Sequence, residues 1–127
     1  MPAFNFQKQF IASITEGTKT GTIRKERKDK RCPADKGDTL TLYTGMRTKH
    51  CALIAEVECT SVKSFMIHQG LNEQITCYKD GRPIKHQELE NLAIADGFKN
   101  STELVAFFRK TAGLPFIGWH IEWESKA

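Results

Sequence analysis

The sequence predicts an α+β fold, in which a small curved antiparallel sheet or barrel is flanked by about three helices. Segments of alternating polarity, typical of strands, stand before, between and after segments of helical period. Short turns join them without the regular strand–helix alternation of a parallel sheet. The 127 residues contain no linker, internal repeat or low-complexity tract, so we expect a single domain over 1–127.

The first predicted elements are a helix and a strand. Four apolar residues recur at helical spacing between Phe6 and Ile14, and Gly17 stands where a helix C-cap glycine would. We therefore expect a helix over 5–16. It leads into a stretch at 19–24 in which β-branched residues favour a strand.

A charged loop at 25–35 and two further strands follow. The first of these, at 39–43, is half-buried, and its alternation puts Tyr43 on the polar face. The second is longer, and the segment 62–67 behind it fits either another short strand or a helical turn. The predicted inward row of the longer strand is Cys51, Leu53, Ala55, Val57 and Cys59.

The segment 75–84 is predicted to be a hairpin that leaves the main body. Its Asp80-Gly81 turn supplies positive φ angles at low cost. A second helix follows and is expected to end near Asp96 and Gly97.

A third helix and a final strand complete the predicted elements. Asn100 followed by Glu103 is a capping-box signal, and the helix it begins stops before Gly113. In the strand, large apolar residues that are expected to point inward alternate with polar residues. The inward residues are Trp119, Ile121 and Trp123, and the outward ones are His120, Glu122 and Glu124.

Composition indicates a soluble globular protein without a membrane span. Apolar residues make up 39% and charged residues 27%, and no run approaches the roughly 18 apolar residues of a membrane-spanning helix. The N-terminus has no basic region followed by an apolar one, so we expect a cytoplasmic location. The four cysteines form no Cys-x-x-Cys pair, so we expect no metal or other cofactor, with Cys51 and Cys59 reduced and filling the core. The histidines, expected at the surface or satisfied, are His50, His68, His86 and His120.

Positive charge is concentrated in two places. The net charge is +4, and seven basic residues stand against three acidic ones between Arg24 and Lys36. A second basic cluster surrounds Arg47 and Lys49. This distribution favours a polyanionic partner such as RNA or a nucleotide. The alternative is a charged loop that keeps the protein soluble.

The stretch 17–24 carries the densest set of reactive and anion-binding groups. Within it, Lys19 and Thr22 would point to opposite faces of a regular strand, because successive side chains alternate. They share one site only if Lys19 lies in the preceding turn or if Gly21 marks a bulge. The alternative is a solvated strand edge whose lysine deters edge pairing.

Taken together, several segments resemble the ASCH domain family, whose members adopt a PUA-like β-barrel. The resemblance covers almost the whole chain, with 75–84 as a probable insertion. The segments that carry it are 17–24 (Gly-Thr-Lys-Thr-Gly-Thr-Ile-Arg), 36–38 (Lys-Gly-Asp), 40–49, 95–98 (Ala-Asp-Gly-Phe) and 115–123.

Two branches of that family imply different enzymes. One branch hydrolyses acetylcytidine with a lysine, a threonine three positions later and a carboxylate; these map to Lys19, Thr22 and Asp96, although that branch has glutamate at the last position. The other branch resembles ribonucleases, and its catalytic tyrosine and lysine map to Tyr43 and Lys49. We expect a protein that binds RNA or a nucleotide and acts as a metal-free, ribonuclease-like hydrolase. The amidohydrolase and a non-catalytic RNA-binding module are the alternatives. The expected nucleic-acid contacts are Lys19, Arg24, Lys25, Arg27, Arg47 and Lys49.

The two enzyme readings need different chemistry. A threonine hydroxyl is a weak nucleophile, and a lysine whose pKa is lowered from about 10.4 can act as its base. A carboxylate then transfers the proton at the leaving amine. Cleavage of RNA instead needs a base for the 2′-hydroxyl and a cation over the phosphate, which Tyr43 and Lys49 would provide without a metal.

Overall fold

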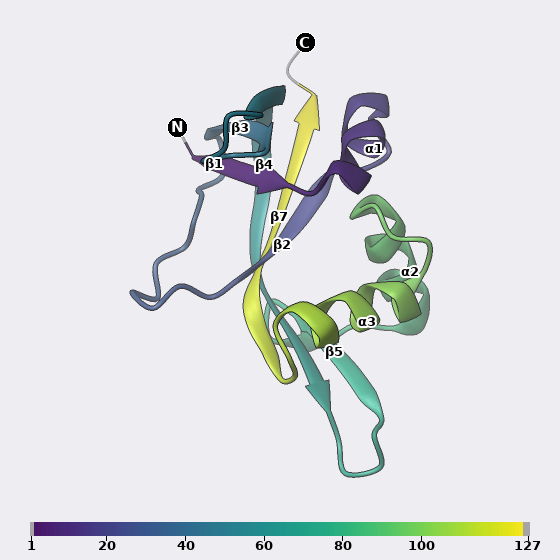
Figure 1. Ribbon diagram of the computed structural model, residues 1–127. Coiled ribbons are helices and arrows are strands. Elements are labelled where there is room, and N and C mark those ends of the chain that lie inside the picture. Colours follow the sequence, from purple (N-terminus) through teal and green to yellow (C-terminus); the bar gives the residue numbers. More distant parts are fainter. Residues whose placement is uncertain (1, 126–127) are drawn as a thin grey trace.

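A computed structural model describes residues 2–125 and has an α+β fold, as predicted. Seven strands form one mixed sheet, and α-helices cover part of it (Figure 1). In chain order the elements are β1 (Ala3–Phe6), the 3-10 helix η1 (Lys8–Phe10), α1 (Ile11–Glu16), β2 (Gly21–Lys25), β3 (Thr39–Thr44), β4 (Ala52–Gln69), β5 (Ile75–Lys79), β6 (Arg82–Pro83), α2 (His86–Ala95), α3 (Ser101–Thr111) and β7 (Phe116–Ser125).

The sheet differs from the expected antiparallel barrel in two ways. First, β1 runs parallel to β3, whereas the other pairs are antiparallel. The predicted helix at 5–16 therefore starts late, because the residues before Gln7 pair as a strand. Second, the order of neighbouring strands in the sheet is β1-β3-β4-β5-β6, and β7 joins β2 to β4. Among the described strands the sheet is not closed.

The long strand β4 organises the sheet. Its first half pairs with β3, its second half with β5, and β7 runs along its other edge from Val57 to Ile67. The segment 62–67, whose sequence fits either a strand or a helical turn, is therefore part of β4. The predicted inward row is wrong at Cys51 and Leu53, which are exposed, the latter to 53%. The pairing of β7 with β4 begins only at Val57, so this end of β4 has β3 alone as its neighbour in the described sheet.

Helices cover one face of the sheet. In Figure 1, α1, α2 and α3 lie on one side, whereas the basic loop at 26–38 projects from the other. The predicted α3 cap is confirmed, because the Asn100 side chain accepts a hydrogen bond from the Glu103 amide at 2.9 Å. The α3 residue Phe108 packs against Phe116 of β7 with ring centroids 4.6 Å apart.

Turn geometry follows the sequence at two predicted places. The hairpin turn has positive φ at both Asp80 (56°) and Gly81 (77°), as its composition predicts. The first helix ends at Gly17, whose φ of 82° is the left-handed conformation of a C-cap glycine. Within 2–125, no helix has the length and apolar character needed to cross a membrane.

Candidate functional site

Lys19 lies in the connection between α1 and β2, before the strand begins. Its backbone amide donates to the Ser13 carbonyl at 2.9 Å, which holds the connection against α1. The register of β2 against β7 is continuous from Gly21 to Lys25. The first of the two predicted solutions therefore holds: Lys19 reaches the same site as Thr22 from the preceding turn, without the bulge expected at Gly21.

Asp96 arrives at the same place from the end of α2. It is the C-cap residue of that helix and is 1% exposed. The preceding carbonyl, of Ala95, accepts a hydrogen bond from the Thr20 amide at 2.7 Å, which fastens the helix end to the segment before β2. The chain then turns at Gly97 (φ 95°), where a Cβ would lie 3.0 Å from the Phe10 ring and 3.1 Å from the Lys19 side chain.

The Lys19 ammonium is enclosed by main-chain carbonyls and aromatic rings. Its Nζ donates to the carbonyls of Gly21 (2.7 Å) and Asp96 (2.5 Å) and lies 4.0 Å from Asp96 Oδ2. It also lies 4.8 Å from the centroid of the Phe10 ring. Burial lowers the pKa of Lys19 from 10.5 to about 8, partly opposed by the Asp96 charge and aided by Arg24. The amine therefore gains and loses its proton at a pH well below that of an ordinary lysine.

Thr22 and Arg24 stand two positions apart on β2 and share a face. The Thr22 hydroxyl accepts a hydrogen bond from Arg24 Nε at 3.1 Å, and Arg24 Nη2 donates to the Asn5 carbonyl at 2.7 Å. The guanidinium also lies over the Phe6 ring, 4.7 Å from its centroid. Burial lowers the pKa of Arg24 to about 10, so it stays cationic at neutral pH.

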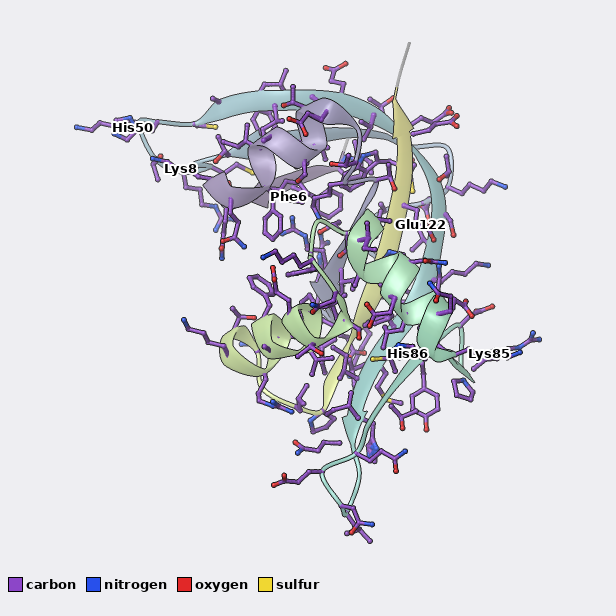
Figure 2. The ribbon with its side chains drawn as sticks, turned by 90° about the vertical axis from the view of Figure 1, so that its right-hand side faces the viewer. Phe6, Lys8, His50, Lys85, His86 and Glu122 are labelled. Carbon is purple, nitrogen blue, oxygen red and sulfur yellow. The ribbon has the colours of Figure 1, made fainter. Side chains whose placement is uncertain are left out.

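The predicted residues Lys19, Thr22 and Asp96 line one small cavity, which we call cavity 1. Its volume is about 120 Å³, close to the roughly 150 Å³ that accommodates a benzene-sized ring. Figure 2 shows Phe6, one of its walls, between α1 and α3. The other lining residues are Asn5, Gln7, Phe10, Ile23, Arg24, Phe98, Phe107 and Phe108. The cavity therefore joins an apolar aromatic wall to a small number of polar groups.

A second, larger cavity adjoins the first and is basic. This cavity 2 has a volume of about 380 Å³ and shares Asn5 and Arg24 with cavity 1. Four of the expected nucleic-acid contacts meet there, on β2, the loop after it and the loop after β3. The residues that line it are Ala3, Phe4, Asn5, Arg24, Lys25, Arg27, Pro33, Met46 and Arg47.

Tyr43 and Lys49 are placed differently. Tyr43 is half-buried on β3, opposite Asn5 of β1 and Leu53 of β4, and Lys49 is exposed in the loop after β3. Its neighbour His50 points away from the body of the molecule (Figure 2). Among the described residues that line cavities 1 and 2, neither Tyr43 nor Lys49 appears.

Sequence reasoning missed His120, which was expected at the surface or with its hydrogen bonds satisfied. It is 3% exposed; its Nε2 lies 3.4 Å from Asp96 Oδ1, and its Nδ1 has no hydrogen-bond partner among the described residues. The alternation in the sequence of β7 predicts one apolar face and one polar face. β7 pairs on both edges, and at His120 and Ile121 both of its faces are buried. The sequence signal for this is the apolar residue Phe116 and the small residue Gly118 on the same face as His120.

Within residues 2–125, no group of three or more His, Cys, Asp or Glu side chains is arranged to hold a metal ion. A scan against protein-family models, a search of curated proteins and a search of solved structures each gave no match. Membership of the ASCH family is therefore a proposal that rests on the sequence resemblance.

Proposed function

We propose that this chain is a hydrolase that cleaves the amide bond of an acylated cytidine, with cavity 1 as its active site. One observation carries the proposal: Lys19, Thr22 and Asp96, which come from three separate elements or connections, all line that cavity. They are the residues that the resemblance to the acetylcytidine hydrolases implies. The size of cavity 1 suits a single planar base or an acyl group.

In the proposed reaction Lys19 acts as the base. A neutral lysine amine has two hydrogens, and the two carbonyl contacts of Lys19 use both, which leaves the nitrogen lone pair free to accept a proton. The Thr22 hydroxyl gives its proton to Lys19, directly or through one water, as its oxygen attacks the acyl carbon. The Arg24 guanidinium, bonded to that hydroxyl, favours the developing negative charge.

Asp96 handles the proton at the leaving nitrogen. The ammonium formed on Lys19 passes its proton through Asp96 Oδ2, 4.0 Å away, to the nitrogen as the carbon–nitrogen bond breaks. Water activated by the again-neutral Lys19 then hydrolyses the acyl-threonine ester, releases the carboxylic acid and restores Thr22.

The shorter carboxylate, aspartate in place of the glutamate of that branch, fits the space. A Cβ at Gly21 would already lie 3.1 Å from Asp96 Oδ1, so the carboxylate reaches β2 without another methylene.

We further propose that the sheet is an open variant of the PUA-like barrel. Phe6 of β1 packs edge-on against Trp123 of β7, with centroids 6.0 Å apart, although these strands are not paired. This contact across the inside of the sheet supports a barrel-like curvature.

A second function, binding of RNA or a nucleotide, is favoured by cavity 2. Its four basic side chains adjoin cavity 1 through Arg24, so a phosphate in cavity 2 and a base in cavity 1 would belong to one ligand. The ribonuclease reading, with Tyr43 and Lys49, stays a prediction.

Product analysis separates these functions. Purified protein is incubated, in EDTA, with acetylcytidine, its monophosphate and an RNA oligomer that contains it. We expect release of acetate and of the free cytosine amine, with the oligomer length unchanged. Shortening of the oligomer would support the ribonuclease reading instead, and salt-dependent binding without any product would support a binding module.

A further inference from the structure

His120 stands between the candidate site and the surface of the sheet. Its Nε2 lies 3.4 Å from Asp96 Oδ1, and its Nδ1 lies 3.5 Å from Glu122 Oε1. The same Glu122 oxygen accepts a hydrogen bond from Lys79 Nζ on β5 at 2.7 Å. A continuous row of polar groups thus joins buried Asp96 to side chains that reach solvent.

We propose that His120 is a positioning residue for Asp96: its Nε2–H holds the carboxylate at the wall of cavity 1. Asp96 Oδ1 has no hydrogen-bond partner among the described residues, and a buried carboxylate oxygen without one is costly. The imidazole is the side chain placed to supply the donor. The effect on rate rests on the proposed function, whereas the contact itself does not.

A glycine in β2 makes room for the contact between Asp96 and His120. Gly21 stands beside both groups, and a Cβ there would lie 3.1 Å from Asp96 Oδ1 and 3.1 Å from His120 Nε2. Any larger residue would push the two groups apart or shift them out of line. The missing side chain at Gly21 therefore leaves the space in which the carboxylate and the ring meet.

Glu122 lies beside the other ring nitrogen, Nδ1, which has no hydrogen-bond partner among the described residues. A flip of the imidazole would exchange both nitrogens with ring carbons, so Nε2 would lose its alignment with Asp96. Glu122 is itself anchored by Lys79, the cation nearest to it, while Lys63, opposite His120 on β4, is exposed. The ring thus lies between two carboxylates, and its Nε2 faces Asp96.

The test combines a spectroscopic and a kinetic measurement. In ¹⁵N-labelled full-length protein at neutral pH, we expect Nε2 of His120 to carry a proton whose resonance shifts in the Asp96→Asn variant. For acetate release, His120→Gln keeps an N–H donor near the Nε2 position and is expected to retain kcat within about threefold. His120→Phe, which fills the space without a donor, is expected to lose at least about tenfold in kcat with little change in KM.

Two results would overturn the inference. One is an imidazole protonated on Nδ1 alone, which would leave no donor facing Asp96. The other is equal kcat in folded His120→Gln and His120→Phe variants. If the wild-type protein releases no acetate, the proposed function fails, and the nitrogen spectrum by itself decides whether His120 holds Asp96.

Discussion

Lys19 and Asp96 are 77 residues apart in the chain, yet Lys19 Nζ donates a hydrogen bond of 2.5 Å to the Asp96 main-chain carbonyl. The bond fixes the lysine through the backbone at the end of α2, while the Asp96 carboxylate lies 4.0 Å away. Because the anchor is a main-chain carbonyl, it holds the lysine independently of the Asp96 side chain. Two side chains that must exchange a proton are thereby held at a fixed separation.

Replacement of Thr22 tests the nucleophile. Thr22→Val keeps the buried shape but removes the hydroxyl, so we expect acetate release to fall at least about a hundredfold. Thr22→Ser keeps the hydroxyl and is expected to retain most of the activity. Equal activity in the two variants, measured with circular dichroism as the folding control, would remove Thr22 from the mechanism.

Asp96→Asn tests the proton transfer. The Asp96 charge raises the pKa of Lys19, so its loss lowers that pKa further below its present value of about 8. We therefore expect kcat to fall about a hundredfold, and the residual activity to reach its plateau at a lower pH than in the wild type. An unchanged rate in Asp96→Asn would contradict the assignment.

The fit of aspartate predicts the effect of restoring the family's glutamate. Asp96→Glu adds a methylene where Oδ1 already lies close to β2, and overpacking of a buried site costs about 1–3 kcal/mol. We expect a lower free energy of unfolding in denaturant titration and no gain in activity. A more active and equally stable glutamate variant would show that the space is larger than described.

Gly21→Ala tests the close approach at β2. Its new Cβ would lie 3.1 Å from Asp96 Oδ1 and His120 Nε2, so we expect a loss of about 1–3 kcal/mol in stability together with reduced activity. Gly70→Ala is the matched control, because the nearest atom to its Cβ is 3.6 Å away and it lies in the β4–β5 connection, outside the residues that line the cavity. Equal losses in both variants would mean that Gly21 has no special role.

The basic cavity predicts a salt-dependent affinity for phosphate. Removal of Arg27 and Arg47 is expected to weaken binding of a single-stranded RNA oligomer and to reduce the slope of log affinity against log salt by about 0.7 for each phosphate that is no longer neutralised. Hydrolysis of uncharged acetylcytidine should change little, because cavity 1 is intact. Lys85→Ala, an exposed residue before α2, controls for net charge alone.

Local signals predicted the fold where one segment determines its own structure. Gly17, the Asp80-Gly81 turn and the Asn100 cap act over a few residues, and each has the expected geometry. The sequence predicted the pairing between distant segments less well. The parallel β1–β3 pair and the exposure of Leu53 depend on which strands become neighbours, which periodicity in one segment does not specify.

The sequence likewise predicted some residues of the candidate site and missed another. Lys19 and Thr22 stood out because reactive types are crowded within a few positions, and Asp96 entered through the resemblance. His120 did not, since a single histidine in an alternating strand looks like a surface residue until α2 and β7 are seen to meet. Its role depends on a contact with a residue on a distant element, for which the sequence offers no local pattern.

The pH dependence of acetate release, measured in EDTA, tests the central claim most directly. A base must be neutral to act, so the rate with wild-type protein should rise about tenfold per pH unit below the pKa of Lys19 and level off above about 8. Lys19→Met should lose this activity at every pH, while Lys85→Arg should keep it. A rate that does not change between about pH 6 and 9, or an active Lys19→Met variant, would contradict the assignment of Lys19 as the base in cavity 1.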